Sequence, residues 1–279
     1  MRTVELVAGI KSSVLGFGCA PILGSVDGAV ARRALAVALD EGITHFDVAP
    51  SYGYGQAEAW LGRELAGRRD NVVLATKFGI RATASARLLQ PLKPLVRWAK
   101  KLRGRRPANT GSPSSGATTL GDRFHARVAM EPANLRASVE KSLRALRTDH
   151  LDYLFLHEPR EAIVGIDALA AEVERLKTEG KIRAWGLAFM RDRQAMHEAV
   201  LPRFDVLQYD LPPDGPGYER MRSERAGCSN ILFSPFRGRG AGVPRNEVLS
   251  RLAADFPRSV ILCSMFNPDH IRTNARALA

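Results

Sequence analysis

Short apolar runs alternate along this chain with longer segments in which apolar residues recur at helical spacing. The runs are rich in β-branched and aromatic residues, and several are closed by Gly or Pro, which is typical of buried strands. These runs predict eight strands, at residues 14–20, 45–49, 72–77, 151–156, 182–188, 206–209, 231–234 and 260–264.

Helices are predicted between these strands, because apolar positions there repeat three or four residues apart. Asp27 is placed to cap the first helix and Gly42 to end it, and Asn267 precedes Pro268 at the start of the last helix. The predicted helices cover residues 28–41, 56–65, 134–146, 166–179, 192–200, 218–225, 246–256 and 268–278.

This regular alternation of strands and helices predicts a (β/α)8 TIM barrel of the α/β class. Residues 3–11 are expected to form an N-terminal β-hairpin, and residues 1–279 a single barrel domain. An open doubly wound sheet is the structural alternative. It is disfavoured because residues 15–20 lack the third glycine of a dinucleotide-binding G-x-G-x-x-G turn.

A long insertion, about residues 81–127, follows the third strand and breaks the alternation. Residues 95–103 predict a short amphipathic basic helix, and the Ser-, Thr- and Gly-rich residues 109–121 predict a mobile stretch. Loops of this length in a compact domain are usually functional or disordered. A basic helix packed over the barrel is the simplest interpretation of this insertion.

The net charge of +12 is concentrated in this insertion, because no Asp or Glu lies between Asp70 and Asp122. Weak contact of residues 81–106 with an anionic membrane or an acidic partner is therefore an alternative interpretation. No recognition motif or aromatic stacking platform accompanies the charge, so a nucleic-acid partner is not expected.

The three cysteines, Cys19, Cys228 and Cys263, are odd in number and far apart, which excludes a disulfide framework and indicates a reducing compartment. Residues 1–11 lack the apolar core of a signal peptide, and no apolar run approaches the roughly 20 residues that span a bilayer. We therefore expect a cytoplasmic protein. The histidines are dispersed without the spacing of a metal site, so no metal is expected.

Four ionisable residues stand at or just beyond the ends of predicted strands: Asp47, Tyr52, Lys77 and His157. In a barrel of parallel strands these ends converge on one face, which carries the chemistry. A free tyrosine titrates at about 10, and a nearby ammonium stabilises its phenolate and lowers that pKa. A carboxylate would hold the lysine, and a histidine would orient a carbonyl oxygen. Such a site protonates an oxygen while hydride from a nicotinamide attacks the carbon.

The chain here resembles the aldo-keto reductase family, and the matching motifs occur in family order over most of its length. They are Gly16-Phe17-Gly18, Phe46-Asp47-Val48-Ala49-Pro50-Ser51-Tyr52-Gly53, Ala75-Thr76-Lys77-Phe78-Gly79, Asp152-Tyr153-Leu154-Phe155-Leu156-His157, Lys181-Ile182-Arg183-Ala184-Trp185-Gly186, Phe233-Ser234-Pro235 and Asn267-Pro268-Asp269-His270. His157-Glu158-Pro159 is most similar to the branch that includes aldose and galactose dehydrogenases.

The resemblance implies a barrel enzyme that interconverts a small-molecule carbonyl compound (an aldehyde, ketone or sugar) and an alcohol. It implies Tyr52 as general acid/base, Lys77 as the modulator of its pKa, Asp47 as the holder of Lys77, and His157 as the residue that orients the substrate. Glu158 is expected at the rim of the site, where contact with substrate is the less favoured interpretation.

The resemblance also implies a site for NADP(H) or NAD(H). The residues that it assigns to the cofactor are Gly18, Gln208, Phe233, Ser234, Pro235, Gly238, Ser264, His270 and Asn274. The family often has Ser-Asn where this chain has Ala188-Phe189, and Lys or Arg for the 2′-phosphate where it has Ser264 and His270. Both cofactors therefore stay open.

Two other functions are compatible with the sequence. Ala188-Phe189, the reduced phosphate site and the basic insertion suit a catalytically weak, cofactor-binding regulatory or membrane-associated protein on the same barrel. Alternatively, Lys77 could form a Schiff base with a carbonyl substrate. A lysine held by Asp47 stays protonated, however, and is a poor nucleophile.

Overall fold

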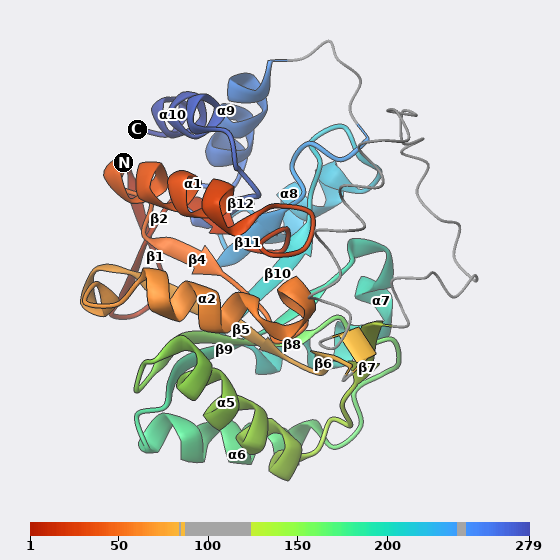
Figure 1. Cartoon of the computed structure of the whole chain (residues 1–279). Coiled ribbons are helices and arrows are strands. Elements are labelled where there is room, and N and C mark those ends of the chain that lie inside the picture. The colour runs from red at the N-terminus through yellow and green to blue at the C-terminus, as the bar shows by residue number, and fades with distance from the viewer. Residues whose placement is uncertain (84, 87–123, 239–243) are drawn as a thin grey trace.

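Eight parallel strands close into a barrel in this computed structural model, which describes residues 1–83, 85–86, 124–238 and 244–279 (Figure 1). The order around the barrel is β10-β11-β12-β3-β4-β5-β8-β9. The barrel strands are β3 (Leu15–Gly18), β4 (His45–Asp47), β5 (Val73–Phe78), β8 (Leu151–His157), β9 (Ile182–Phe189), β10 (Val206–Asp210), β11 (Asn230–Phe233) and β12 (Ser259–Cys263). Because β12 pairs with β3, the sheet has no open edge, and the predicted TIM barrel is confirmed.

Helices form the outer layer around the barrel (Figure 1). They are α1 (Gly28–Asp40), α2 (Ala57–Glu64), α5 (Pro132–Leu146), α6 (Ile166–Thr178), α7 (Gln194–His197), α8 (Tyr218–Arg225), α9 (Arg245–Asp255) and α10 (Pro268–Ala277). Both predicted caps are present: the Asp27 side chain accepts from the Ala29 N–H at 2.9 Å, and Asn267 accepts from the Asp269 N–H at 2.8 Å.

The single helix predicted at residues 192–200 is wrong. The chain there forms a 3₁₀ turn at Arg191–Arg193, the short helix α7, and a second 3₁₀ segment at Glu198–Arg203. Pro202 lies inside this last segment, and proline lacks the backbone N–H that a continuing α-helix requires.

A small antiparallel hairpin, β1 (Thr3–Val7) and β2 (Ile10–Ser13), packs against the barrel, as predicted. Leu6 and Ile10 of the hairpin are buried in the same apolar cluster as inward-facing barrel residues such as Tyr153. The hairpin therefore closes one end of the barrel, and the carboxyl ends of the strands form the accessible rim.

The two ends of the predicted insertion pair with each other, as strands β6 (Ile80–Ala82) and β7 (His125–Arg127). The predicted basic helix at residues 95–103 and the stretch at 109–121 lie outside the described residues, as does most of the 81–106 segment.

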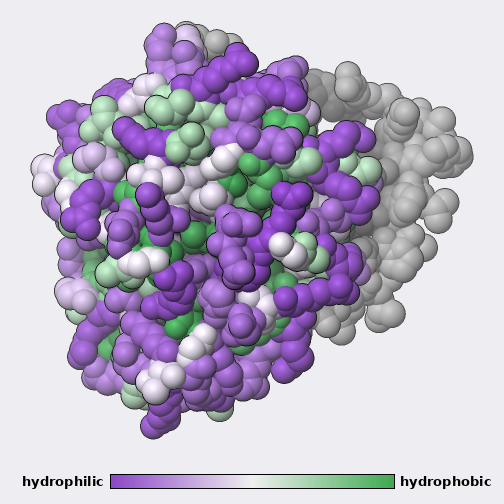
Figure 2. Space-filling view, turned by 90° about the vertical axis from the view of Figure 1, so that its left-hand side faces the viewer, coloured by the Kyte–Doolittle hydropathy of each residue, from purple (hydrophilic) through white to green (hydrophobic). Residues whose placement is uncertain are grey.

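Within the described ranges, no helix has both the length and the apolarity to cross a bilayer. The face shown in Figure 2 is covered mainly by polar side chains, with small apolar patches between them.

Candidate active site

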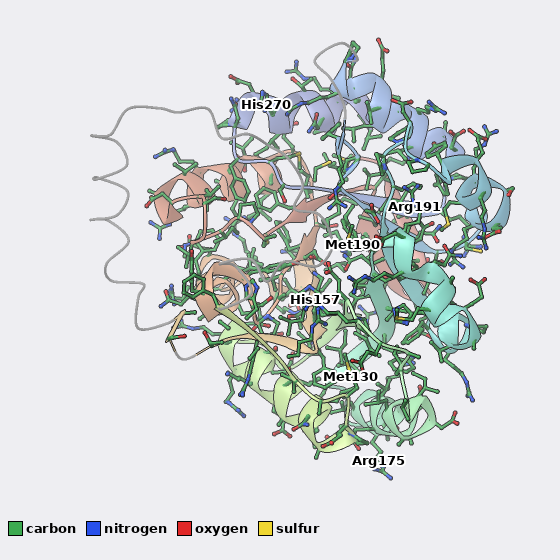
Figure 3. The ribbon with its side chains drawn as sticks, turned by 90° about the vertical axis from the view of Figure 1, so that its right-hand side faces the viewer. Met130, His157, Arg175, Met190, Arg191 and His270 are labelled. Atoms are coloured by element: carbon green, nitrogen blue, oxygen red, sulfur yellow. The ribbon has the colours of Figure 1, made fainter. Side chains whose placement is uncertain are left out.

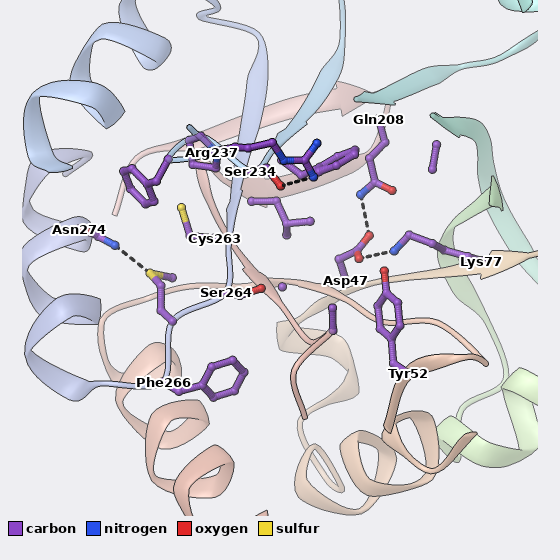
Figure 4. A pocket seen from close by; sticks show the side chains of 18 of the residues that line it. Asp47, Tyr52, Lys77, Gln208, Ser234, Arg237, Cys263, Ser264, Phe266 and Asn274 are labelled. Atoms are coloured by element: carbon purple, nitrogen blue, oxygen red, sulfur yellow. Dashed lines mark hydrogen bonds and ion pairs between the residues drawn. The ribbon is translucent and has the colours of Figure 1, made fainter. Parts of the chain in front are cut away.

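The four residues of the predicted proton-transfer set come from different elements and line one cavity of about 440 Å³ at the carboxyl rim (Figure 4). Asp47 is the last residue of β4, Lys77 lies near the end of β5, and His157 is the last residue of β8. Tyr52 begins a 3₁₀ turn that follows β4. The barrel therefore brings these side chains together although they are far apart in sequence.

The turn that carries Tyr52 depends on a glycine. Gly53 has φ +56°, and a Cβ at this position would lie 2.6 Å from the Ile22 carbonyl oxygen. A side chain would therefore be strained by its backbone conformation and would also clash with a neighbouring loop. With glycine at position 53, the turn packs closely and directs the Tyr52 hydroxyl toward Asp47 and Lys77 (Figure 4).

Lys77 and Asp47 form a buried ion pair, with 3% and 2% of their surfaces exposed. The Lys77 ammonium donates to Asp47 Oδ1 and to the Val48 carbonyl oxygen at 3.3 Å. Asp47 Oδ2 accepts from Gln208 Nε2 at 2.7 Å, so both carboxylate oxygens are hydrogen-bonded. Burial lowers the pKa of Lys77, but Asp47 and Tyr52 more than offset this, so the net pKa is raised and the lysine stays charged.

Tyr52 is a protonated phenol at neutral pH. Burial raises the pKa of Tyr52 to about 12; the Lys77 charge opposes this shift, and Asp47 reinforces it. The Lys77 ammonium lies 5.1 Å from the centre of the Tyr52 ring and is in hydrogen-bond contact with the phenol. Lys77 therefore lowers the pKa of Tyr52, as expected, but desolvation by burial outweighs this effect and the net pKa lies above the ordinary value.

His157 presents a neutral imidazole beside the phenol. Burial holds the pKa of His157 well below its usual value, and the charges of Lys77 and Arg127 act in the same direction. The rings of Tyr52 and His157 are nearly perpendicular, with centroids 5.9 Å apart. A neutral imidazole keeps one N–H donor, which can hydrogen-bond an oxygen placed near the phenol.

Most of the residues assigned to a cofactor lie in the wall of the same cavity. Those lining it are Gly18, Gln208, Phe233, Ser234, Pro235, Ser264, His270 and Asn274. Gly238 does not line it, and residues 239–243 beside it lie outside the described part of the chain. His270 stands near the start of α10, well away from His157 (Figure 3).

Gln208 has one buried polar atom whose hydrogen-bonding capacity is not met by the described residues. Its Oε1 is buried and has no hydrogen-bond partner among the residues that the structure describes, whereas its Nε2 is held by Asp47. Ala188 lines the cavity without a polar side chain, and the neighbouring Phe189 is buried against Tyr209, with ring centroids 5.8 Å apart. A carboxamide N–H₂ placed here would find an acceptor in Gln208, so the site fits a nicotinamide.

Comparison with known proteins decides the family. Residues 14–210 match the model of the aldo/keto reductase family. The chain belongs to this family. Aldo-keto reductase YhdN of Bacillus subtilis (strain 168) is 31% identical over 201 residues, which is 70% of this chain and 49% of that protein. D-threo-aldose 1-dehydrogenase of a Pseudomonas species is 30% identical over 190 residues, which is 66% of this chain and 52% of that protein. The chain thus spans about half the length of these curated relatives.

Solved structures of the family share the whole fold. Aldo-keto reductase AKR11C1 of Bacillus halodurans superposes with a TM-score of 0.66 at 22% identity, covering 99% of this chain and 90% of that one. Glycerol dehydrogenase AKR11B4 of Gluconobacter oxydans superposes with a TM-score of 0.67 at 18% identity, with the same coverages. The barrel of this aldo-keto reductase family member is therefore the family fold.

The cavity of this aldo-keto reductase family member also contains a cation that was not predicted from the sequence. Arg245 lines the cavity, and its guanidinium lies 5.3 Å from the centre of the Phe236 ring. Its Nη1 is 3.3 Å from His270 Nδ1. In this fold, helices begin at the rim where strands end, so the position of Arg245 at the start of α9 was a usable signal.

Other lining residues also went unassigned from the sequence. Phe236, Arg237 and Phe266 line the cavity, and Arg237 pairs with Asp210 at 3.3 Å. Over the ranges described, no group of three or more His, Cys, Asp or Glu side chains is arranged to hold a metal ion.

Proposed function

We propose that this chain is an NAD(P)-dependent oxidoreductase that interconverts a carbonyl compound and an alcohol, with Tyr52 as general acid/base. One observation carries the proposal: the Tyr52 phenol, the Lys77–Asp47 ion pair and the His157 ring line one cavity together with Gln208, whose Oε1 has no partner among the described residues. Family membership supports the same chemistry.

The side chains divide the work of reduction. A nicotinamide bound in the cavity supplies the hydride that the carbonyl carbon accepts. The Tyr52 O–H donates its proton to the carbonyl oxygen. Because the pKa of Tyr52 is high, the phenol is protonated at neutral pH and has this proton to give. The Lys77 ammonium stabilises the phenolate left behind, and Asp47 holds that ammonium. Neutral His157 donates a hydrogen bond that orients the carbonyl oxygen.

The residues that would hold the cofactor lie along the cavity from Gln208 to α10. Gln208 Oε1 would accept from the carboxamide, and Phe233, which lines the same cavity, would offer an aromatic face to the nicotinamide ring. At the other end, Arg245 and His270 are placed to bind a phosphate group, and Asn274 lies beside them in the cavity wall. Each of these assignments is part of the proposal.

A sugar is a supported candidate among carbonyl substrates. Two relatives are named D-threo-aldose 1-dehydrogenase and L-galactose dehydrogenase. The His157-Glu158-Pro159 sequence at the end of β8 is similar to that branch of the family.

The test is a spectrophotometric assay of the purified protein with NADPH or NADH and a panel of aldehydes, ketones and sugars. Wild-type protein is expected to consume the reduced cofactor, and Tyr52→Phe is expected to lose about 10²- to 10⁴-fold in turnover, the usual contribution of a general acid. A protein that binds cofactor tightly and turns over no carbonyl would contradict the proposal.

That result would favour the second candidate, a catalytically weak cofactor-binding regulatory or membrane-associated protein. The observation that favours it is the loss of polar side chains at Ala188 and Phe189, which leaves the nicotinamide fewer partners. A Schiff base on Lys77 is disfavoured, because Asp47 keeps the pKa of the buried amine above its usual value.

A further inference from the structure

Glu158 occupies a strained position immediately after His157. Its φ is +43°, in the left-handed region that residues other than glycine rarely adopt. Its N–H donates to the Ala188 carbonyl at 2.7 Å, and its carbonyl accepts from Arg127 Nη1 at 2.7 Å. The backbone is therefore held on both sides in a conformation that Gly would adopt at lower cost, and such strain tends to cluster at functional sites.

The Glu158 carboxylate is an uncompensated charge in the cavity wall. Glu158 lines the cavity, and its side chain has no hydrogen bond or ion pair with any residue in the described ranges. Glu158 and Tyr52 line the same cavity, and the negative charge of Glu158 contributes to raising the pKa of the Tyr52 phenol. The other carboxylate among the described lining residues, Asp47, is hydrogen-bonded to both Lys77 and Gln208.

Among the described residues, no nearby cation forms an ion pair with the Glu158 carboxylate. Arg127 bonds the carbonyl oxygen of Glu158 and is not among the lining residues. Arg237 lines the cavity but is paired with Asp210 at 3.3 Å. Arg245 lies beside His270, on the part of the wall that α9 and α10 form. Within the described part of the chain, Glu158 is therefore the cavity-lining carboxylate that no cation pairs, whereas Asp47 is paired with Lys77.

We propose that Glu158 selects the substrate, favouring neutral hydroxylated carbonyl compounds over anionic ones. An ionised carboxylate only accepts hydrogen bonds, and it accepts them strongly from hydroxyl groups. It also repels a carboxylate or phosphate on a competing substrate, which gives specificity through an unfavourable contact. The inference rests on the proposed function, because it requires a carbonyl group bound at Tyr52.

The test compares kcat/KM for three carbonyl compounds in wild-type protein and in Glu158→Gln, which removes the charge at constant size. Glyceraldehyde carries hydroxyl groups, propanal has the same carbon chain without them, and succinic semialdehyde carries a negative charge. The matched control is Glu161→Gln, because Glu161 is exposed in the same loop and lies outside the cavity.

Glu158→Gln is expected to lower kcat/KM for glyceraldehyde about tenfold, mainly through KM, as for the loss of one hydrogen bond to a charged group. Succinic semialdehyde is expected to gain about tenfold, and propanal to change by less than about twofold. Glu161→Gln should leave all three values unchanged. Glu158→Gly, which relieves the left-handed strain, should fold normally and show the same change in selectivity.

Equal changes for the three compounds, or no change, would overturn the role of Glu158 while leaving the proposed function standing. The same selectivity change in Glu161→Gln would also overturn it. Wild-type protein that consumes no reduced cofactor with any of the three compounds would overturn the proposed function, and this inference with it.

Discussion

The Asp47 carboxylate accepts hydrogen bonds from two side chains at once, and these bonds fix the position of the Lys77 ammonium. Oδ1 accepts a hydrogen bond from the Lys77 ammonium, and Oδ2 accepts one from Gln208 Nε2 at 2.7 Å. One amide N–H of Gln208 is used by Asp47, and its Oε1 has no hydrogen-bond partner among the described residues. The residue that the resemblance assigned to the cofactor is thus also part of the network that positions Lys77.

The pKa values of the site predict opposite pH dependences for the two reaction directions. Reduction needs the protonated phenol, which is lost only as the pH rises toward the Tyr52 pKa of about 12. Its kcat/KM should therefore be flat from about pH 6 to 9. Oxidation needs the phenolate, so its kcat/KM should rise about tenfold per pH unit over that range.

Steady-state profiles in both directions test this expectation. His157 adds no inflection there, because burial keeps its pKa well below the usual range. A reduction profile that falls with a midpoint near neutral pH would show that Lys77 outweighs desolvation, contrary to the balance described above.

At the scale of elements, the sequence predicted most of the barrel because buried strands and amphipathic helices carry clear local patterns. The helix predicted at residues 218–225 forms with those bounds, as α8. The apolar spacing predicted one helix at residues 192–200, but Pro202 lacks the backbone N–H that a continuing α-helix needs, and it lies in a 3₁₀ segment. It also could not show how Arg245 on α9 approaches His270 on α10, because that contact depends on how neighbouring elements pack.

The turn after β4 positions Tyr52, and substitution of its Gly53 tests whether the close packing of this turn is needed. Gly53→Ala should lower the free energy of unfolding by about 2 kcal/mol or more, from a left-handed φ and a contact of 2.6 Å with the Ile22 carbonyl oxygen. Activity should fall as well, because the turn carries Tyr52.

Gly67→Ala is the matched control, since Gly67 also has positive φ, but no atom of the described residues lies within 4 Å of its Cβ position. Its cost should be about 1 kcal/mol, from the backbone conformation alone. Urea unfolding of both variants measures the difference. Equal destabilisation would mean that the close approach at Gly53 contributes nothing.

At the scale of the whole molecule, the hairpin closes one end of the barrel and the ligand cavity opens at the other. The cavity wall differs in charge along its length, with Glu158 after β8 and Arg245 with His270 at α9 and α10. This distribution suits a neutral substrate next to Tyr52 and an anionic group at α10. It was not evident from the sequence, where the net charge of +12 is concentrated in the insertion.

The basic end of the cavity predicts a preference for NADP over NAD. The sequence suggested a reduced phosphate site at Ser264 and His270, but Arg245 supplies a guanidinium 3.3 Å from His270 Nδ1. Arg245→Ala should weaken NADP⁺ binding about tenfold, as for the loss of one charge-assisted contact, and leave NAD⁺ binding unchanged.

Arg258→Ala is the control for net charge, because Arg258 is exposed and lies outside the cavity. Dissociation constants for NADP⁺ and NAD⁺, measured by fluorescence quenching, separate loss of a specific phosphate contact from a general effect of net charge. If Arg245→Ala weakens both cofactors equally, or neither, Arg245 does not contact the 2′-phosphate.

The most direct test of the central claim measures Tyr52→Phe in a preparation whose NADPH dissociation constant is determined alongside its rate. The account predicts unchanged cofactor affinity with kcat reduced about 10²-fold or more, since only the proton donor is removed. Wild-type kcat in this variant would show that the phenol transfers no proton, and would contradict the account.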